Sequence, residues 1–176
     1  PLIESLDTTA QAFAVECSSF RLEHTERFRT QASAWLNIAP DHLDWHSSYQ
    51  MYFDAKAKMW ANCLPTDVAV APVDDVNILA VARASAARMV TFGATEGDYR
   101  VVGEELCGPL GSIMSISRMK RSLPHDITNA LAAAAVCIES GLAGAEHVAQ
   151  ALEQFENAPH RIQFVSELDG VRWYND

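Results

Sequence analysis

The stretch NIAPDHLDWHSSYQMYFDAKAKMW, residues 37–60, decides the fold, because it joins the end of a strand to a loop and the loop to a helix. Apolar residues at its start predict a strand over residues 34–38, which ends in the loop through Pro40. Either Ser47 or Ser48 can cap the helix that follows, which we expect over residues 48–63. A strand followed by a helix is a unit of an α/β fold, in which ligands bind at strand ends.

One face of this helix is predicted to be apolar and to carry Lys56. At helical spacing, Lys56 shares its face with Tyr49, Tyr52, Phe53, Met59, Trp60 and Cys63. Lys58 is rotated by about 200° and falls among polar and small residues, which indicates a solvated side chain. Desolvation favours a neutral amine at Lys56, and a neutral amine can react with carbon dioxide to give a carbamate that binds a metal. The alternative is that Lys56 extends past its apolar neighbours to solvent.

The loop before the helix carries a second candidate ligand, His42, directly after Asp41. A neutral imidazole next to carboxylates can bind a divalent ion. His42 and His46, four residues apart, can equally be solvated or help to cap the helix. The histidines alone therefore leave both interpretations open.

Strands and helices alternate through the first half of the chain. We expect strands over residues 13–17, 68–71 and 89–92 and a helix over residues 76–87. This alternation predicts an α/β fold with a largely parallel sheet covered by helices. Residues 98–102 and 112–117, separated by glycines and a proline, predict a small inserted antiparallel hairpin. Two helices (124–140 and 145–157) and a second hairpin (162–168 with 171–174, joined by Asp169 and Gly170) complete the prediction.

Composition narrows the function classes. A net charge of −10 and a pI near 4.9 argue against nucleic acid or an anionic membrane as a partner. The cysteines at positions 17, 63, 107 and 137 form no C-x-x-C pair and lie mostly in apolar runs, which predicts buried free thiols rather than disulfides or a zinc site. With neither an 18-residue apolar span nor a signal peptide in the sequence, we expect a cytoplasmic protein. A chain of 176 residues with 49% hydrophobic content can form one domain and the edge of another.

Several short motifs occur in a fixed order along nearly the whole chain. They are ECSSFRLE at residues 16–23, NIAPDHLDWH at 37–46, the Ala55-Lys56 pair, VTFGATEGDYRV at 90–101, HDITNALAA at 125–133, APHR at 158–161 and WYND at 173–176. In this order they resemble the motifs of the Mur ligase family. The resemblance implies the central domain of these enzymes, with a fold like that of the P-loop NTPases. The form E-x-S-S-F-x-L-E is typical of the members that add D-glutamate.

The chain also departs from the family pattern. It contains no G-x-x-x-x-G-K-[ST] phosphate loop, and it begins at Pro1 and ends at Asp176, so we expect a fragment that has no ligase activity alone. Residues 1–158 would be an incomplete central ATP-binding domain, and residues 159–176 the linker and first hairpin of a C-terminal domain. Arg21 stands where glutamine is usual, Asn157-Ala158 replaces a glycine-containing turn, and Gln163 stands where glutamate is common.

The resemblance implies ATP-dependent amide formation in peptidoglycan precursor synthesis. Phosphoryl transfer from ATP would convert the carboxylate of UDP-N-acetylmuramoyl-L-alanine into an acyl phosphate, which the amine of D-glutamate attacks. Two magnesium ions would neutralise the charge that gathers there. By resemblance, Glu16, His42 and the carbamate on Lys56 are the catalytic residues and the metal ligands.

The remaining site residues are also implied by the resemblance. Asn129, His125, Arg161 and Asp176 would contact the nucleotide, and Ser18, Ser19 and His160 the substrate. For several of these, plainer roles stay open. The serines can cap the next helix, Asn129 can be an exposed residue near a helix start, and the His160-Arg161 pair can be a surface hinge.

Other function classes also remain open. The chain can belong to another Mur-type ligase or to a ligase like folylpolyglutamate synthase. A metal-dependent hydrolase can use histidines, aspartate and a carbamylated lysine, and would act without nucleotide. A nucleotide-binding fragment without catalysis is the last alternative, and the sequence does not indicate an oligomeric state.

Overall fold

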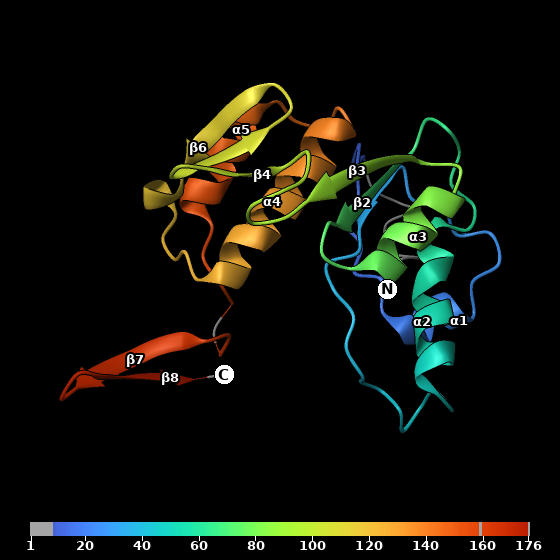
Figure 1. Cartoon of the computed structure of the whole chain (residues 1–176), viewed down its shortest axis with the longest axis horizontal. Helices are drawn as coiled ribbons and strands as arrows, with labels where there is room; N and C mark the ends of the chain where they lie inside the picture. The colour runs from blue at the N-terminus through green and yellow to red at the C-terminus, as the bar shows by residue number, and fades with distance from the viewer. Residues whose placement is uncertain (1–8, 159, 176) are drawn as a thin grey trace.

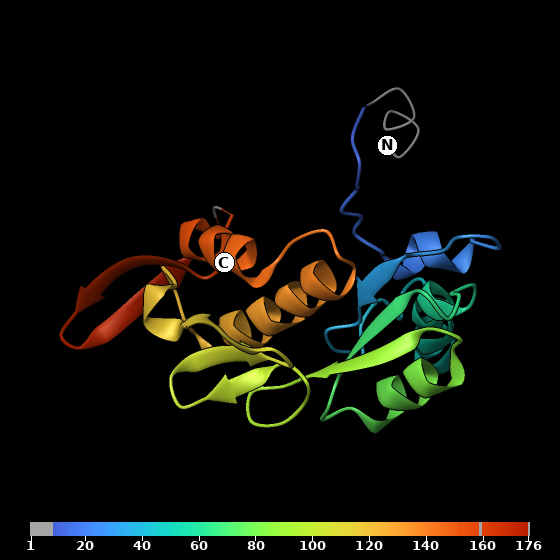
Figure 2. The same cartoon turned by 90° about the horizontal axis from the view of Figure 1, so that it is seen from above.

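The computed structural model describes residues 9–158 and 160–175. The described chain contains one parallel sheet, one antiparallel sheet, a separate hairpin and five α-helices, among them the short α1 (Ser19–Glu23). Figures 1 and 2 show two views of this arrangement. The predicted α/β fold is confirmed.

The parallel sheet has three strands in the order β1 (Ala32–Ala34), β2 (Val68–Pro72) and β3 (Arg88–Phe92). The chain passes from β1 to β2 through α2 (Tyr49–Ala57) and the 3-10 turn η2 (Lys58–Trp60), and from β2 to β3 through α3 (Val76–Ala84). All five residues of β2 are buried, as expected for a central strand with both faces covered.

The side chains of β2 alternate between two hydrophobic cores, because successive residues of a strand point to opposite faces. Val68 and Val70 pack in a core with the alanine-rich helix α4 (Pro124–Glu139) and with α5 (Ala145–Gln154). Ala69 and Ala71 belong to the other core, which includes Trp60 and residues of α3. In Figure 1, α4 lies on one side of the sheet and α2 and α3 on the other.

The inserted antiparallel sheet has three strands, β4 (Arg100–Val102), β5 (Glu105–Gly108) and β6 (Gly111–Ser115), and a 3-10 turn, η3 (Ile116–Arg118), follows. The predicted antiparallel insertion is confirmed, but its two expected strands do not pair with each other, because the residues between them form β5. Gly103, with a φ of 62°, allows the tight turn into β5. Leu106 is fully buried in the same core as Tyr99, which holds β5 in the sheet.

Two other predicted strands differ in the structure. Residues 13–17 form no strand, and most of their side chains are exposed rather than packed in a core. The strand expected over residues 34–38 is the shorter β1, which starts two residues earlier and already ends at Ala34. Trp35 N still donates to Val70 O at 3.0 Å, but the Trp35 indole then donates to Asn37 O at 3.0 Å, as the chain leaves the sheet.

The helix predictions are confirmed in position. Ser48 caps α2, and its hydroxyl accepts a 3.2 Å hydrogen bond from Met51 N. The C-terminal hairpin of β7 (Gln163–Leu168) and β8 (Val171–Asn175) is also as predicted, with Asp169 and Gly170 both left-handed in its turn. Every residue of the two strands is exposed, and Figure 1 shows the hairpin projecting from the rest of the chain.

Two predictions from composition concern the whole chain. All four cysteines are free, and Cys63 is the buried one. Within residues 9–158 and 160–175, no helix combines the length and apolar character needed to cross a membrane.

Candidate functional site

The motif at residues 16–23 forms the approach to α1 and its single turn. Ser18 is the N-cap of this helix, and its hydroxyl accepts a 3.4 Å hydrogen bond from Arg21 N. Ser19 is buried, and its hydroxyl lies 3.0 Å from Nε2 of His46. The capping role is therefore observed for Ser18, while Ser19 links α1 to the loop before α2.

Five rings pack where this loop meets α1, and we call them the aromatic cluster: Phe20, His42, Trp45, His46 and Tyr52. Phe20 lies between the two histidines, with ring centroids 4.7 Å from His42 and 5.9 Å from His46. The His46 ring is 1% exposed, and its Nδ1 has no hydrogen-bond partner within the described chain. Packing of the cluster and two polar contacts to α1, from His46 Nε2 to Ser19 and from the Trp45 indole to Glu23, fix the loop together.

His42 occupies the most constrained position of this loop. Its φ of 55° is left-handed, a conformation that few residues other than glycine adopt. The Asp41 carboxylate accepts from His42 N at 2.7 Å, and His42 O accepts from Trp45 N and His46 N at 3.1 and 2.9 Å. The His42 side chain remains 39% exposed, so the imidazole is both oriented by the cluster and accessible.

The two lysines of α2 and η2 both reach the main chain around α1. The Lys56 amine is half-buried and donates to Cys17 O at 3.2 Å. Burial lowers its pKa, an effect that the nearby Cys17 and Glu16 partly oppose. Lys58 is half-buried too, and donates to Glu23 O at 2.5 Å. The prediction of a solvated Lys58 was wrong, because the end of α1 lies within reach of its side chain.

Glu16 is an exposed carboxylate near Lys56. Within the described residues, no group of three or more His, Cys, Asp or Glu side chains is arranged to hold a metal ion. Magnesium, however, is often held by one or two protein carboxylates and by substrate phosphates rather than by an all-protein cage. Glu16, with a carbamate on Lys56, fits this second kind of site. No measured contact joins His42 to either residue within the described chain.

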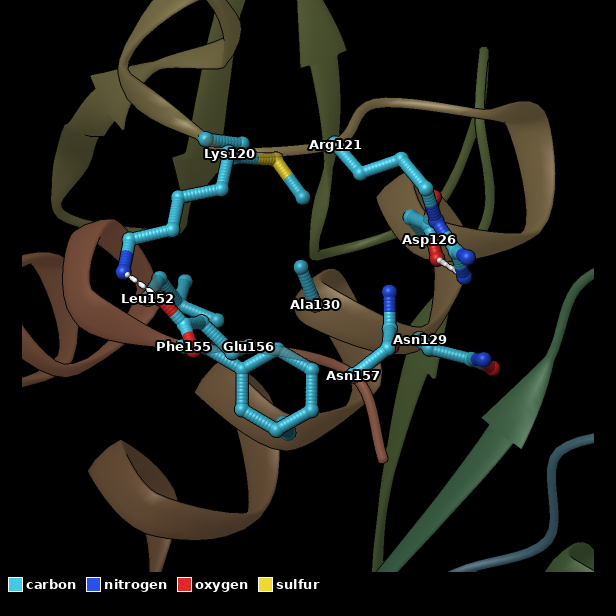
Figure 3. A pocket seen from close by; sticks show the side chains of 11 residues that line it. Lys120, Arg121, Asp126, Asn129, Ala130, Leu152, Phe155, Glu156 and Asn157 are labelled. Carbon is cyan, nitrogen blue, oxygen red and sulfur yellow. Dashed lines mark hydrogen bonds and ion pairs between the residues drawn. The ribbon is translucent and has the colours of Figure 1, made fainter. Parts of the chain in front are cut away.

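A separate cavity of about 360 Å³ lies between the start of α4 and the end of α5. Ala130, Ala133, Leu152 and Phe155 are among its apolar lining residues. Figure 3 shows Asn129 and Arg121 at its polar edge. Lys120 and Glu156 form an ion pair across another part of its rim. An apolar lining with a few polar groups at the edge is typical of small-molecule sites.

The other predicted nucleotide and substrate contacts lie near this cavity or outside the described residues. His125 is exposed at the start of α4, with Nε2 3.4 Å from an Asp126 oxygen. His160 and Arg161 are exposed in the segment that leads to β7, and His160 Nδ1 lies 2.7 Å from Asn175 Nδ2. Asp176 lies outside the described residues.

The sequence prediction missed Arg121 and Asp126, which form a bidentate ion pair with two hydrogen bonds of 2.7 Å. Asp126 stands within the quoted motif HDITNALAA, and its place in the first turn of a helix is a signal for a helix-capping carboxylate. No local sequence pattern indicates the role of Arg121. Its partners lie as far as 41 positions along the chain.

The sequence is similar to the proteins of one family, the Mur ligases. The model of the Mur ligase middle domain matches residues 2–137. A UDP-N-acetylmuramoylalanine--D-glutamate ligase of Frankia casuarinae is 34% identical, over 100% of this chain and 39% of that protein. The protein of the same name from Escherichia coli strain K12 is 35% identical, over 100% of this chain and 40% of that protein. The chain thus spans about two fifths of the length of these curated relatives.

Solved structures agree on the fold. The crystal structure of MurF from Acinetobacter baumannii has a TM-score of 0.65 at 24% identity, and covers 79% of this chain and 32% of that one. The structure of a UDP-N-acetylmuramoyl-L-alanyl-D-glutamate--2,6-diaminopimelate ligase has a TM-score of 0.66 at 20% identity, and covers 86% and 34%.

Proposed function

Because the chain belongs to the Mur ligase family, we propose that the whole protein is an ATP-dependent ligase that adds D-glutamate to UDP-N-acetylmuramoyl-L-alanine. Its relatives at 34–35% identity carry the name of this reaction. The E-x-S-S-F-x-L-E motif at residues 16–23 supports the same member of the family. We place the reaction in the cytoplasm, as a step of peptidoglycan precursor synthesis.

The observation that carries this proposal is the environment of Lys56. Its amine is half-buried beside Cys17 O, near the Glu16 carboxylate, and its pKa is lowered, first of all by burial. A lowered pKa increases the neutral fraction, and only a neutral amine can take up carbon dioxide. Carbamylation would change the Lys56 side chain from a cation into an anion. The carbamate oxygen would then be a metal ligand next to Glu16.

Bound ATP would supply the phosphoryl group, and bound magnesium would neutralise the negative charge of its phosphates. We assign Glu16, the Lys56 carbamate and His42 to hold the two ions. The aromatic cluster keeps the His42 imidazole in one orientation before any ligand arrives, which lowers the cost of ordering it on binding.

We assign the cavity between α4 and α5 to the nucleotide end of the site. Asn129 lines it, and the exposed His125 lies one helical turn earlier on α4. An amide can both donate to and accept from a base, which suits the edge of an adenine. Arg161 and Asp176 are assigned to the nucleotide as well, and Ser18 and His160 to the other substrate. Ser19 is buried and cannot reach the substrate directly, so we assign it an indirect role next to Ser18.

The domain division follows the same assignment. We propose that residues 1–158 belong to the central ATP-binding domain and residues 159–176 to a linker and the first hairpin of the next domain. The exposed apolar side chains of the hairpin, such as Phe164, Val165 and Trp173, support this division. A hairpin with so much apolar surface is normally covered by further chain.

The test of the reaction uses the whole protein with ATP, magnesium, UDP-N-acetylmuramoyl-L-alanine and one amino acid at a time. We expect phosphate release with D-glutamate, and much less with L-glutamate or diaminopimelate. Phosphate release that needs diaminopimelate instead would assign the protein to another branch of the family. Hydrolysis without nucleotide would assign it to a different reaction class.

The carbamate has a test that does not depend on activity. The 176-residue chain is incubated with ¹³C-bicarbonate, and its ¹³C NMR spectrum is compared with that of Lys56→Ala and Lys58→Ala. We expect a carbamate signal in the wild type and in Lys58→Ala only. Its absence from the wild type at alkaline pH would contradict the role of Lys56.

A further inference from the structure

Arg121 joins the first turn of α4 to residues about 40 positions further along the chain. Its Nε and one terminal nitrogen donate to the two oxygens of Asp126, each at 2.7 Å. The other terminal nitrogen donates to the main-chain carbonyls of Arg161 and Ile162, each at 2.8 Å. With its amide oxygen turned toward the guanidinium, Asn157 accepts two more hydrogen bonds, at 2.8 and 3.0 Å. The guanidinium has five N–H groups, so the single Nε hydrogen is shared between Asp126 and Asn157.

The anchor of this arrangement is the first turn of α4. The Asp126 side chain is 10% exposed, and it also accepts from Leu123 N at 3.0 Å. Burial raises the pKa of Asp126, but the hydrogen bonds from Arg121 and Leu123 outweigh it, so the pKa is lowered and the carboxylate stays charged. Arg121 is therefore held by an ionised carboxylate, Asp126, which lies three residues before Asn129 on α4.

The segment that Arg121 holds is strained. His160 and Ile162 have left-handed φ angles of 60° and 47°, and for a β-branched residue such as isoleucine this is a rare and costly conformation. Such a backbone persists only where its surroundings hold it. Both carbonyls that Arg121 binds belong to this turn.

Arg121 also faces the hairpin that follows. A hollow of about 290 Å³ lies between Arg121, Leu123 and the hairpin residues Phe164, Glu167, Arg172 and Tyr174. The hydrogen bonds of Arg121 therefore reach the turn just before the hairpin, while its side chain also borders this hollow. The neighbouring basic residues have other partners: Arg118 pairs with Glu153 of α5, and Lys120 pairs with Glu156 just after this helix.

We propose that Arg121 is a positioning residue that locks Asn157 and residues 160–162 against the start of α4. It thereby sets His160 and Arg161 relative to Asn129 and the cavity in Figure 3. When Arg121 releases the two carbonyls, the turn relaxes and the hairpin can change its direction. The local claim stands on the contacts of Arg121 alone, and its consequence for catalysis rests on the function proposed above.

Trypsin tests the local claim on the 176-residue chain, because Arg161 is exposed and the carbonyl of the bond that trypsin would cut is one that Arg121 binds. The rate of cleavage between Arg161 and Ile162 is followed by mass spectrometry. We expect cleavage about tenfold faster in Arg121→Gln than in the wild type, since several hydrogen bonds to a charged group are lost. Arg118→Gln is the matched control. It removes one arginine from an exposed ion pair with Glu153 and should be cleaved at the wild-type rate.

Equal rates in Arg121→Gln and Arg118→Gln, with both variants folded by circular dichroism, would overturn the proposal. If Arg121→Gln does not fold, because it leaves the Asp126 charge without its partner, the double variant Arg121→Gln/Asp126→Asn removes that charge and takes its place. The double variant must then be cleaved faster than Arg118→Gln, or the proposal is wrong.

The consequence for catalysis has a separate measurement on the whole protein. We expect Arg121→Gln to raise KM for ATP severalfold with a smaller change in kcat, because the nucleotide contacts are displaced rather than removed. An unchanged KM beside faster cleavage would confine Arg121 to a structural role. If the whole wild-type protein has no ligase activity, the proposed function is wrong. The local claim about Arg121 would still be decided by the trypsin experiment.

Discussion

The amine of Lys56 donates a hydrogen bond of 3.2 Å to the main-chain oxygen of Cys17. The bond connects α2 to the segment just before α1, one residue after Glu16. It places a lysine with a lowered pKa beside the carboxylate that we assign to magnesium. Several consequences of this relationship and of the cores around it can be measured.

Lys56→Ala should abolish the activity of the whole protein, because it removes the carbamate oxygens. Acetate should restore part of the activity by occupying the space that the carbamate leaves. The measurement is activity in acetate compared with chloride at matched ionic strength. Equal activity in the two salts would defeat the carbamate hypothesis.

Lys58→Ala is the matched control for Lys56, and the structure changes what we expect of it. The sequence alone predicts a nearly silent substitution, but Lys58 donates to Glu23 O at the end of α1. We therefore expect a loss of about 1 kcal/mol in the free energy of unfolding, with activity retained and no response to acetate. An inactive Lys58→Ala beside an active Lys56→Ala would reverse the assignment.

Glu16→Ala and His42→Ala should each lower turnover of the whole protein by orders of magnitude and raise the magnesium concentration needed for half-maximal rate. Glu16 is exposed outside the two hydrophobic cores, so the melting temperature of Glu16→Ala should change little, whereas His42→Ala loses ring contacts with Phe20 and Tyr52 and should melt at a lower temperature. Asn129→Ala should act mainly on KM for ATP. Near-normal turnover of Glu16→Ala at ordinary magnesium would show that this carboxylate is not a ligand.

Asp67 should make stability depend on pH at the acid end. Its carboxylate is buried and accepts two hydrogen bonds from Arg29, at 2.7 and 2.6 Å. These bonds lower the pKa of Asp67, although burial opposes the shift, and the bond from Leu64 N adds to it. A lowered folded pKa stabilises the fold fully above the unfolded value of about 3.9, and this stabilisation is lost as pH falls through the folded pKa.

The measurement is urea unfolding at pH 7 and pH 3. Asp67→Asn should lose less of its free energy of unfolding between these two values than the wild type loses. Asp74→Asn, at an exposed aspartate in the same half of the chain, should follow the wild type. Parallel losses in Asp67→Asn and the wild type would mean that Asp67 does not titrate in this range.

Leu131→Ala should reduce the free energy of unfolding by about 2–5 kcal/mol, because it leaves a cavity in the core between α4 and the sheet. Leu131 is fully buried, whereas Leu110, in the turn before β6, is 98% exposed. Leu110→Ala makes the same chemical change and should stay within about 0.5 kcal/mol of the wild type. Similar melting temperatures for the two variants would contradict the placement of the core.

The helices could be predicted because their signals are local. Ser48 caps α2, and Pro124 begins α4, where the sequence places them. The inserted sheet was less predictable, since Glu105–Gly108 becomes a strand only through the burial of Leu106 beside distant residues. In the site, the motifs supplied residue types and order, but the main-chain partners of Lys56, Lys58 and Arg121 lie 35 or more positions away. No local pattern encodes such contacts.

The alternation of β2 between two cores has a thermodynamic consequence. The backbone of β2 places Val70 in one core and Ala69 and Ala71 in the other. If β2 leaves the sheet, both cores therefore become exposed to water. The two layers should therefore melt as one cooperative unit, with a single calorimetric transition. Amides of β2 should exchange their hydrogens only through global opening, while the exposed hairpin exchanges through local fluctuations.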